Sequence, residues 1–81
     1  MMKLEILSPE KTLFRGDTDS VRLPGVVGSF TVWPHHAPLI SALAPGEIRY
    51  RNADKEEKLD IQGGFAEIRD DTITVCIESN E

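Results

Sequence analysis

The segment from Leu23 to Gly46 constrains the fold of this chain more than any other part of the sequence. It reads LPGVVGSFTVWPHHAPLISALAPG and holds four prolines, three glycines, two adjacent histidines and one tryptophan in 24 positions. Turn residues at this density, alternating with short apolar runs, specify a particular backbone path rather than a generic loop. We therefore expect short strands joined by defined turns in this part of the chain.

Turn signals recur along the whole chain at roughly the 8–12-residue spacing that is typical of an all-β sandwich or barrel. They occur at Ser8-Pro9, Gly16-Asp17, Pro24-Gly25, Pro34 with Pro38, Pro45-Gly46, Asn52-Ala53-Asp54, Gly63-Gly64 and Asp70-Asp71. No window of about ten residues or more has a helical period. The sequence therefore predicts an all-β fold with almost no helix, in which two antiparallel sheets pack face to face as a sandwich.

Between the turns, apolar and polar residues alternate with a period of two, which indicates strands with one face on a core and one toward water. The alternating apolar sets are Met2, Leu4 and Ile6; Ile48 and Tyr50; Leu59 and Ile61; and Ile73, Val75 and Ile77. The residues expected to complete the core are Phe14, Val21, Leu23, Phe30, Val32, Leu39, Ile40, Leu43, Phe65 and Ile68. At 81 residues the chain forms one domain, 1–81, with a modest core.

The charge balance limits the classes of partner. Nine Lys and Arg residues stand against fourteen Asp and Glu residues, for a net charge of −5. An acidic chain argues against nucleic acid and against direct adsorption to anionic lipid, since both require clustered basic residues. The single cysteine, Cys76, excludes an internal disulfide framework and fits a reducing compartment. With no secretory signal and no long apolar run, we expect a soluble cytoplasmic domain.

Two motifs invite a chemical interpretation that their surroundings do not support. Adjacent residues on an extended chain point to opposite sides, so His35 and His36 cannot both face one metal ion without a special turn, and no third His or Cys set completes a zinc site. Gly63-Gly64 lacks the following Gly-Lys-Ser/Thr of a phosphate-binding loop and instead predicts a tight turn or bulge where a side chain would clash.

The remaining reactive residue types favour structural or interface roles. A lone aromatic such as Trp33 is more often core or interface than a stacking platform, and Trp is enriched at protein–protein hot spots. Cys76 has no nearby His that would activate it as a nucleophile. The acidic pairs Asp17/Asp19, Glu56/Glu57 and Asp70/Asp71 are most simply solvated turns. We expect no catalytic site, no metal and no cofactor.

Two groups of residues together resemble one known family. The first comprises Pro24-Gly25, Gly28, Pro34, His36-Ala37-Pro38, Leu43 and Pro45-Gly46, and the second Gly63-Gly64-Phe65, Glu67 and the strand around Val75. In this order and at this separation they resemble the N-terminal β-sandwich of the ATP synthase epsilon subunit, over nearly the whole chain. The resemblance implies a β-sandwich with structural turns at Pro24, Gly25, Pro38, Pro45, Gly46, Gly63 and Gly64.

The resemblance also implies a function and its contact residues. Epsilon is a non-catalytic rotor subunit in the central stalk of the F-type ATP synthase. It links gamma to the c-ring at the cytoplasmic face of the bacterial plasma membrane, and so couples proton transport to ATP synthesis in the alpha/beta hexamer. The positions that would face gamma are Ser8, His36, Leu39, Ile40 and Ser41. The c-ring contact would be made by Gly28, Ser29 and Phe30, although many members have an acidic residue followed by an aliphatic one at the last two positions.

The chain departs from typical bacterial members at its C-terminus. Those members continue into a helical hairpin that can inhibit hydrolysis and in some cases binds ATP, whereas this chain ends at Ser79-Asn80-Glu81. Either a naturally short form or a fragment would explain this, and we expect neither hairpin-mediated inhibition nor a nucleotide site. Two alternatives stay open: a small carbohydrate-type ligand module around Trp33 and the histidines, and a small enzyme using His35 or His36 as a base.

Overall fold

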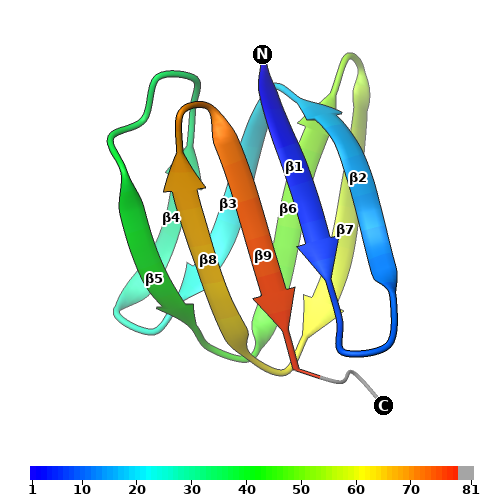
Figure 1. The fold of residues 1–81 in the computed structure, drawn as a ribbon, viewed down its shortest axis with the longest axis vertical. Helices are drawn as coiled ribbons and strands as arrows, with labels where there is room; N and C mark the ends of the chain where they lie inside the picture. The colour runs from blue at the N-terminus through cyan, green and yellow to red at the C-terminus, as the bar shows by residue number, and fades with distance from the viewer. Residues whose placement is uncertain (79–81) are drawn as a thin grey trace.

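The computed structural model describes residues 1–78, and these form nine β-strands without a helix (Figure 1). The strands are β1 (Met2–Leu7), β2 (Thr12–Thr18), β3 (Ser20–Gly25), β4 (Gly28–Val32), β5 (Leu39–Leu43), β6 (Gly46–Asn52), β7 (Lys55–Ile61), β8 (Gly64–Arg69) and β9 (Thr72–Ile77). The prediction of an all-β fold with almost no helix is confirmed over these residues.

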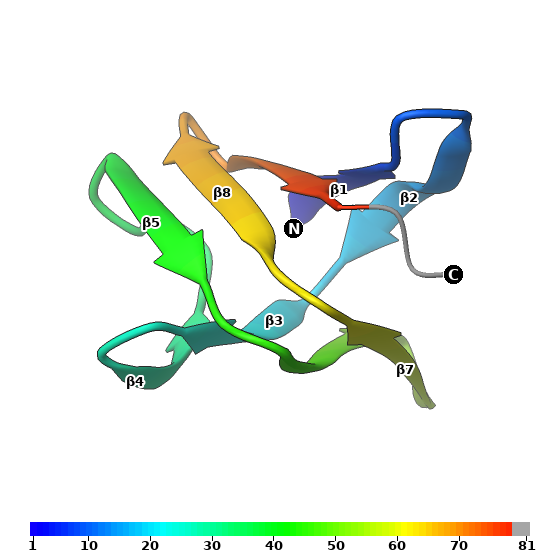
Figure 2. The ribbon, with the colours of Figure 1, turned by 90° about the horizontal axis from the view of Figure 1, so that it is seen from below.

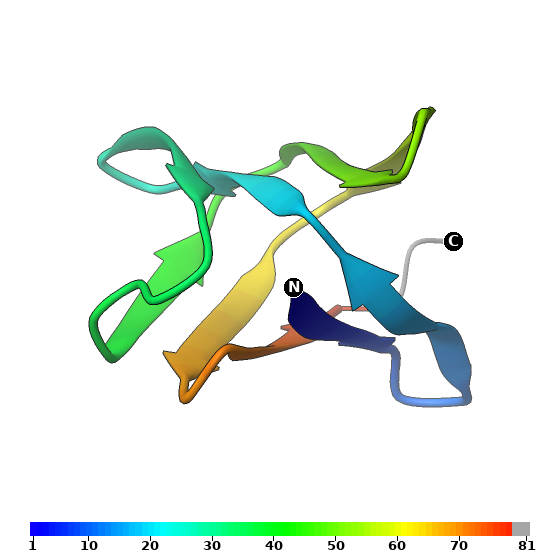
Figure 3. The same ribbon diagram turned by 90° about the horizontal axis from the view of Figure 1, so that it is seen from above.

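The strands form two layers that pack face to face (Figures 2 and 3). One layer has the order β2-β1-β9-β8-β5, and the other contains β3, β6 and β7 with β4 paired to β3. A single ladder pair, Gly25 with Leu43, joins β3 to β5, so the hydrogen-bonded path runs continuously from one layer into the other. The result is a curled, sandwich-like sheet, as the alternating strands predict.

One strand pairing differs from the expected antiparallel arrangement. The first and last strands, β1 and β9, run parallel, with Leu4 opposite Ile73 and Ile6 opposite Val75. All other pairs in the two layers are antiparallel. The alternation of apolar residues depends only on which face is buried, so it cannot distinguish a parallel from an antiparallel neighbour.

The core lies between the layers and is formed by the inward positions of the strands. Its buried hydrophobic members are Met2, Leu4, Ile6, Val21, Leu23, Val32, Leu43, Ile48, Ile61, Ala66, Ile68, Ile73, Val75 and Ile77. Leu13, Phe14, Phe30, Tyr50 and Leu59 are partly buried against them. The faces predicted from the alternating sets are therefore confirmed.

Three residues named for the core lie on the surface: Phe65, which was expected only in the core, and Leu39 and Ile40, which were also expected on a surface that a partner covers. The side chains of Phe65, Ile40 and Leu39 are 51%, 73% and 38% exposed. In β8 the small Ala66 occupies the inward position, together with Ile68, so the larger Phe65 faces outward. The phase of the strand, rather than the size of the side chain, decides which residue is buried.

Most predicted turns fall between strands, and two are displaced. Gly16 lies inside β2, opposite Leu4, and the chain instead leaves β2 around Asp19. Pro24 and Gly25 belong to β3, and the reversal into β4 comes one step later, at Val26 and Val27.

Thr18 is fully buried where the chain passes from β2 in one layer to β3 in the other. Its hydroxyl lies 2.9 Å from the carbonyl oxygen of Ser20 and 2.7 Å from that of Arg51, and it donates toward both. We expect Thr18→Val to lower the free energy of unfolding by about 0.5–1.5 kcal/mol, because valine keeps the shape but removes the hydroxyl that donates to these carbonyls, while the Arg51 carbonyl keeps another donor, the Asp19 amide. Urea unfolding measures the change, and Thr12→Val at an exposed position is the matched control, expected to change stability by less than about 0.5 kcal/mol.

Tyr50 of β6 packs against Phe14 of β2, with ring centroids 4.5 Å apart. Burial, reinforced by the charge of Glu57, raises the pKa of the Tyr50 hydroxyl above 10.0. Folding therefore favours the neutral phenol, and its contribution to stability is present below about pH 10 and is lost as the pH rises through the folded-state pKa. We expect Tyr50→Phe to reduce the loss of stability above about pH 10, measured by urea unfolding across the alkaline range. Equal alkaline losses in both proteins would contradict this assignment.

Candidate functional site

Strand β5 forms an open margin of the larger layer. All five of its residues pair with β8, whereas its other side meets β3 only at Leu43. Near that junction Ala42 accepts a hydrogen bond from the Val26 amide at 3.1 Å, and the Ala44 amide donates to the Pro24 carbonyl at 2.7 Å. Among residues 1–78 no strand lies beside the edge from Leu39 to Ser41, so that edge is available for a partner.

The outward face beside this edge carries apolar side chains, with the exposed Glu67 as the cross-strand neighbour of Ile40. Ile40 is 73% exposed, Ala42 is exposed, and Phe65 is the cross-strand neighbour of Ala42. Phe65 in turn lies opposite the half-buried Cys76 of β9. We call Ile40, Ala42, Phe65 and Cys76 the β5 patch. Cross-strand partners lie on one face of a sheet, so these side chains form a continuous surface rather than scattered exposed residues.

The predicted gamma-facing residues divide between the two faces of β5. Ile40 belongs to the β5 patch, while Leu39 and Ser41 alternate to the opposite face, where Ser41 lies across from the buried Ala66. The Ser41 hydroxyl donates to the Ala42 carbonyl at 3.1 Å. The signal that could have identified Phe65 and Ala42 is the strand phase, because each is next in the chain to an inward residue, Ala66 or Leu43, and therefore faces outward.

His36 lies in the loop between β4 and β5, close to this edge. Its Nδ1 is 2.7 Å from the Ala37 carbonyl oxygen and donates to it, so the ring is held by its own loop. His35 adopts a positive φ of 68°, and its backbone amide donates to Oδ1 of Asp71 at 2.6 Å. The loop is thereby fastened to the β8–β9 turn, where Asp70 and Asp71 also have positive φ.

Ser8 is not brought together with the other predicted gamma-facing residues. It lies in the β1–β2 turn, where its hydroxyl donates to the Lys11 carbonyl at 3.0 Å and accepts from the Lys11 amide at 3.2 Å. This turn is at the opposite end of the molecule from the loop that carries His36 (Figure 1). A partner that touched both residues would have to span the length of the larger layer.

The β3–β4 hairpin carries the residues predicted to meet the c-ring. Gly28 has a φ of 135° and Ser29 is exposed, while Phe30 is partly buried against the core. At the tip, Val26 is 59% exposed and Val27 98% exposed. These two valines were not among the predicted contact residues. Two apolar residues between Pro24-Gly25 and Gly28 are nevertheless unusual, because turns mostly contain Gly, Pro, Asn, Asp and Ser.

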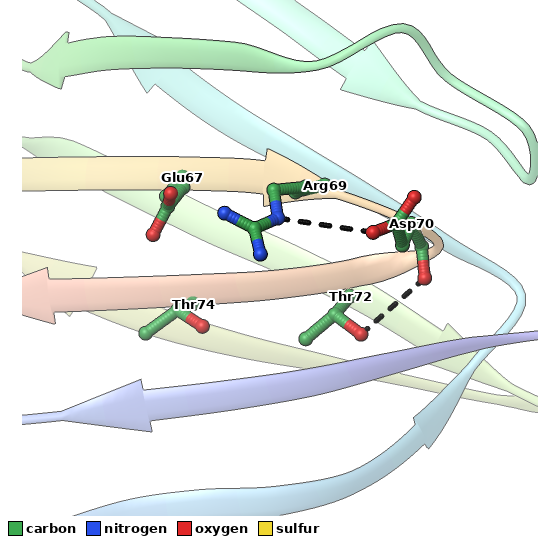
Figure 4. Close-up of a pocket in the computed structure, with 5 residues that line it drawn as sticks. All are labelled: Glu67, Arg69, Asp70, Thr72 and Thr74. Atoms are coloured by element: carbon green, nitrogen blue, oxygen red, sulfur yellow. Dashed lines mark hydrogen bonds and ion pairs between the residues drawn. The ribbon is translucent and has the colours of Figure 1, made fainter.

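A shallow hollow of about 370 Å³ lies on the outward face of β8 and β9 (Figure 4). It is lined by Glu67, Arg69, Asp70, Thr72 and Thr74. Its polar contacts are internal, since Arg69 Nε lies 3.7 Å from Asp70 Oδ2 and the Thr72 hydroxyl donates to the Asp70 carbonyl at 3.5 Å. Figure 4 shows these side chains spread along two strands rather than aimed at one point. The arrangement offers no convergent acid–base pair.

Residues 1–78 contain no group of three or more His, Cys, Asp or Glu side chains placed to hold a metal ion. They also contain no helix that is long and apolar enough to cross a membrane.

Comparison with solved structures finds the same fold in two mitochondrial enzymes. A chain of the Euglena gracilis ATP synthase structure containing OSCP, F1 and the c-ring superposes with a TM-score of 0.88 at 19% identity, covering 94% of this chain and 49% of that chain. A chain of the Tetrahymena thermophila central stalk and c-ring structure gives a TM-score of 0.82 at 15% identity, covering 96% of this chain and 63% of that one. At these identities the likeness establishes the fold alone.

Sequence comparison identifies the family. The chain is 40% identical over 77 residues to the ATP synthase epsilon chain of Leptospira interrogans, and 42% identical over 81 residues to that of Desulfosudis oleivorans. It spans 61% of the length of each relative, while 95% and 99% of the chain itself are covered. Residues 1–81 match the family described as ATP synthase, Delta/Epsilon chain, beta-sandwich domain. The chain therefore belongs to the ATP synthase delta/epsilon family and is similar to epsilon chains along its whole length.

Proposed function

We propose that this domain is a non-catalytic rotor subunit of an F-type ATP synthase, which links gamma to the c-ring at the cytoplasmic face of a bacterial plasma membrane. The observation that carries the proposal is the family match along the full chain. It is supported by the fold shared with chains from central-stalk and c-ring structures. In this role the domain passes proton-driven rotation of the ring to gamma, and thereby acts on the alpha/beta hexamer indirectly.

The β5 patch and the adjoining open edge are the surface that gamma would cover. An edge strand presents backbone groups that can pair with another chain, and monomeric proteins seldom leave such an edge beside exposed apolar side chains. Ile40 and Phe65 supply the apolar area, while the anchored loop with His36 borders it. A protein partner would bury this surface, and gamma is the partner that the family implies.

The β3–β4 hairpin is the segment that would meet the c-ring. Its tip projects Val26 and Val27 into solvent, followed by Gly28 and Ser29. None of these four side chains is charged, so in this chain the contact would rest on apolar and backbone interactions rather than on a salt bridge. The hairpin is held by five ladder pairs between β3 and β4 and by the buried Pro24.

A rotor subunit must resist torque, and the packing of this domain supplies stiffness. Fourteen hydrophobic side chains are buried between the layers, and the ladders connect eight of the nine strands in one path. Sites built on strands hold their geometry better than sites on loops, because neighbouring strands fix the backbone.

Purification from native membranes tests the proposal. The chain, tagged at its C-terminus, would be isolated in mild detergent from membranes of its own cells. We expect gamma and c-ring subunits to be recovered with it in stoichiometric amounts. Recovery of the chain alone, soluble and without those subunits, would overturn the rotor assignment.

A further inference from the structure

The outward face of the smaller layer carries a cluster of arginines beside the only tryptophan. Arg22 of β3 lies opposite Arg49 of β6, and Arg51 is two residues further along β6 on the same face. These are three of the five arginines in the chain. Trp33, just beyond the end of β4, is 60% exposed. The three arginines gather on one face of a protein whose net charge is −5.

These residues share one hollow. Its volume is about 290 Å³, and its lining comes from β3, β4, β6 and β7 and the segments next to them. The lining residues are Asp19, Ser20, Arg22, Thr31, Trp33, Arg49, Tyr50, Arg51 and Glu56. Ser20 and Thr31 add hydroxyl-bearing side chains to the lining, so the hollow combines cationic, hydrogen-bonding and aromatic residues.

Two of the three arginines are uncommitted. Arg49 Nε donates to Glu47 Oε1 at 2.7 Å, so the carboxylate of Glu47 offsets the positive charge of Arg49. Within residues 1–78 neither Arg22 nor Arg51 has a carboxylate oxygen within 4.0 Å of its guanidinium group, although Glu56 is the cross-strand partner of Arg51 and also lines the hollow. Asp19 accepts a hydrogen bond from the Ala53 amide at 3.1 Å and is therefore partly engaged. Two guanidinium groups beside an exposed indole are thus left for a ligand.

We propose that this surface, defined by Arg22, Arg51 and Trp33, binds a short acidic protein segment that carries an apolar or aromatic side chain between its carboxylates. The carboxylates would bind the two guanidinium groups bidentately, and the apolar side chain would pack on Trp33. Arg and Trp are the residue types that most often carry binding energy at protein interfaces. The inference goes beyond the rotor function, because it concerns the layer that faces away from the β5 patch.

The neighbouring carboxylates select against larger polyanions. Asp19 and Glu56 border the hollow, and Glu47 lies just beyond Arg49. Nucleic acid or an anionic membrane would have to place further negative charge against these groups, and the net charge of the whole chain is also negative. An acidic peptide can direct two carboxylates onto Arg22 and Arg51 and keep the rest of its length away from the acidic rim.

The fluorescence of Trp33 reports directly on peptide binding, since Trp33 is the only tryptophan in the chain. The purified full chain would be titrated with a blocked octapeptide of glutamates with one central phenylalanine, while the tryptophan fluorescence is recorded. We expect a saturable change that weakens as salt is added, because the attraction is between exposed charges. The same peptide with lysines in place of glutamates is expected to produce no saturable change.

Two double variants, each of which removes two positive charges, test where the peptide binds. The double variant Arg22→Gln/Arg51→Gln is expected to weaken peptide binding at least fivefold. The double variant Arg15→Gln/Arg69→Gln removes the same charge from the other layer and is expected to leave binding unchanged. The proposal is overturned if the glutamate peptide gives no saturable change at millimolar concentration, if the lysine peptide binds equally, or if both double variants lose the same affinity. None of these outcomes bears on the recovery of gamma and the c-ring, which tests the rotor assignment separately.

Discussion

Replacing Gly64 with alanine is expected to lower the free energy of unfolding by about 3 kcal/mol or more. Gly64 begins β8 with a φ of 145°, a conformation that residues with a Cβ rarely adopt. A Cβ placed there would lie 2.8 Å from Cα of Ile77 and also collide with the backbone carbonyl of Cys76. Because the obstacle is the backbone of β9, it cannot move aside as a flexible side chain would. A domain of this size has only about 4–12 kcal/mol of stability in total.

Gly63→Ala is the matched control for this prediction. Gly63 has nearly the same φ, 146°, but the closest atom to its Cβ would be Oε2 of the exposed Glu78, at 3.4 Å. The Gly63→Ala variant therefore has the backbone strain without the collision. We expect it to lower the free energy of unfolding by about 1–3 kcal/mol. Urea unfolding followed by circular dichroism measures both variants. If Gly64→Ala were no more destabilising than Gly63→Ala, the close approach of β8 and β9 would not have the energetic role assigned to it.

Replacing Ile40 with glutamate is expected to weaken association with gamma at least tenfold, which corresponds to about 1.4 kcal/mol. Ile40 is 73% exposed, so glutamate at this position is solvated in the free domain. In a complex that covers the patch, the carboxylate would be buried without a partner, and such burial carries a large desolvation cost. The fraction of gamma recovered with the tagged chain from membranes measures the loss.

Thr12→Glu provides the matched control for charge. Thr12 is exposed at the start of β2, which lies at the other margin of the same layer. We expect full recovery of gamma with this variant. Both variants should unfold within about 0.5 kcal/mol of the parent chain, because neither position contributes to the core. Undiminished recovery of gamma with Ile40→Glu would show that the β5 patch is not the gamma-binding surface.

Much of the fold could be predicted because the burial pattern of each strand is local. The alternation of Met2, Leu4 and Ile6, and of Ile73 and Val75, identifies the inward faces before any pairing is known. The pairing itself is not local. The parallel contact between the first and last strands depends on how the whole chain returns to its starting edge, and no short segment encodes that.

The error at Phe65 has a clear physical cause. In β8 an aromatic and a small residue stand side by side, Phe65 and Ala66, and the aromatic one was expected in the core. The strand has to present Ile68 inward, so its period of two also turns Ala66 inward and Phe65 outward. The misplaced turn at Gly16 is similar, since a glycine can occupy a strand as well as a reversal.

The sequence indicates which segment of the chain carries the candidate site, but not which side chains gather on its surface. The family resemblance pointed to the segment around His36 and to β5, and the phase of the strand places Ile40 on the face opposite to Leu39 and Ser41. The structure also adds Phe65 from a strand that is distant in sequence, and Val26 and Val27 at the hairpin tip. Such groupings depend on register and hairpin geometry, which single-residue patterns do not specify.

Cysteine cross-linking in the assembled enzyme tests most directly the central claim that this domain links gamma to the c-ring. In a chain whose own cysteine is removed by Cys76→Ser, Ile40→Cys would report on gamma and Val27→Cys on the c-ring, with Thr12→Cys as an exposed control. The rotor account predicts that the Ile40→Cys product contains gamma, that the Val27→Cys product contains the c subunit, and that the control forms neither. Products that contain neither subunit, or that appear equally from all three positions, would contradict it.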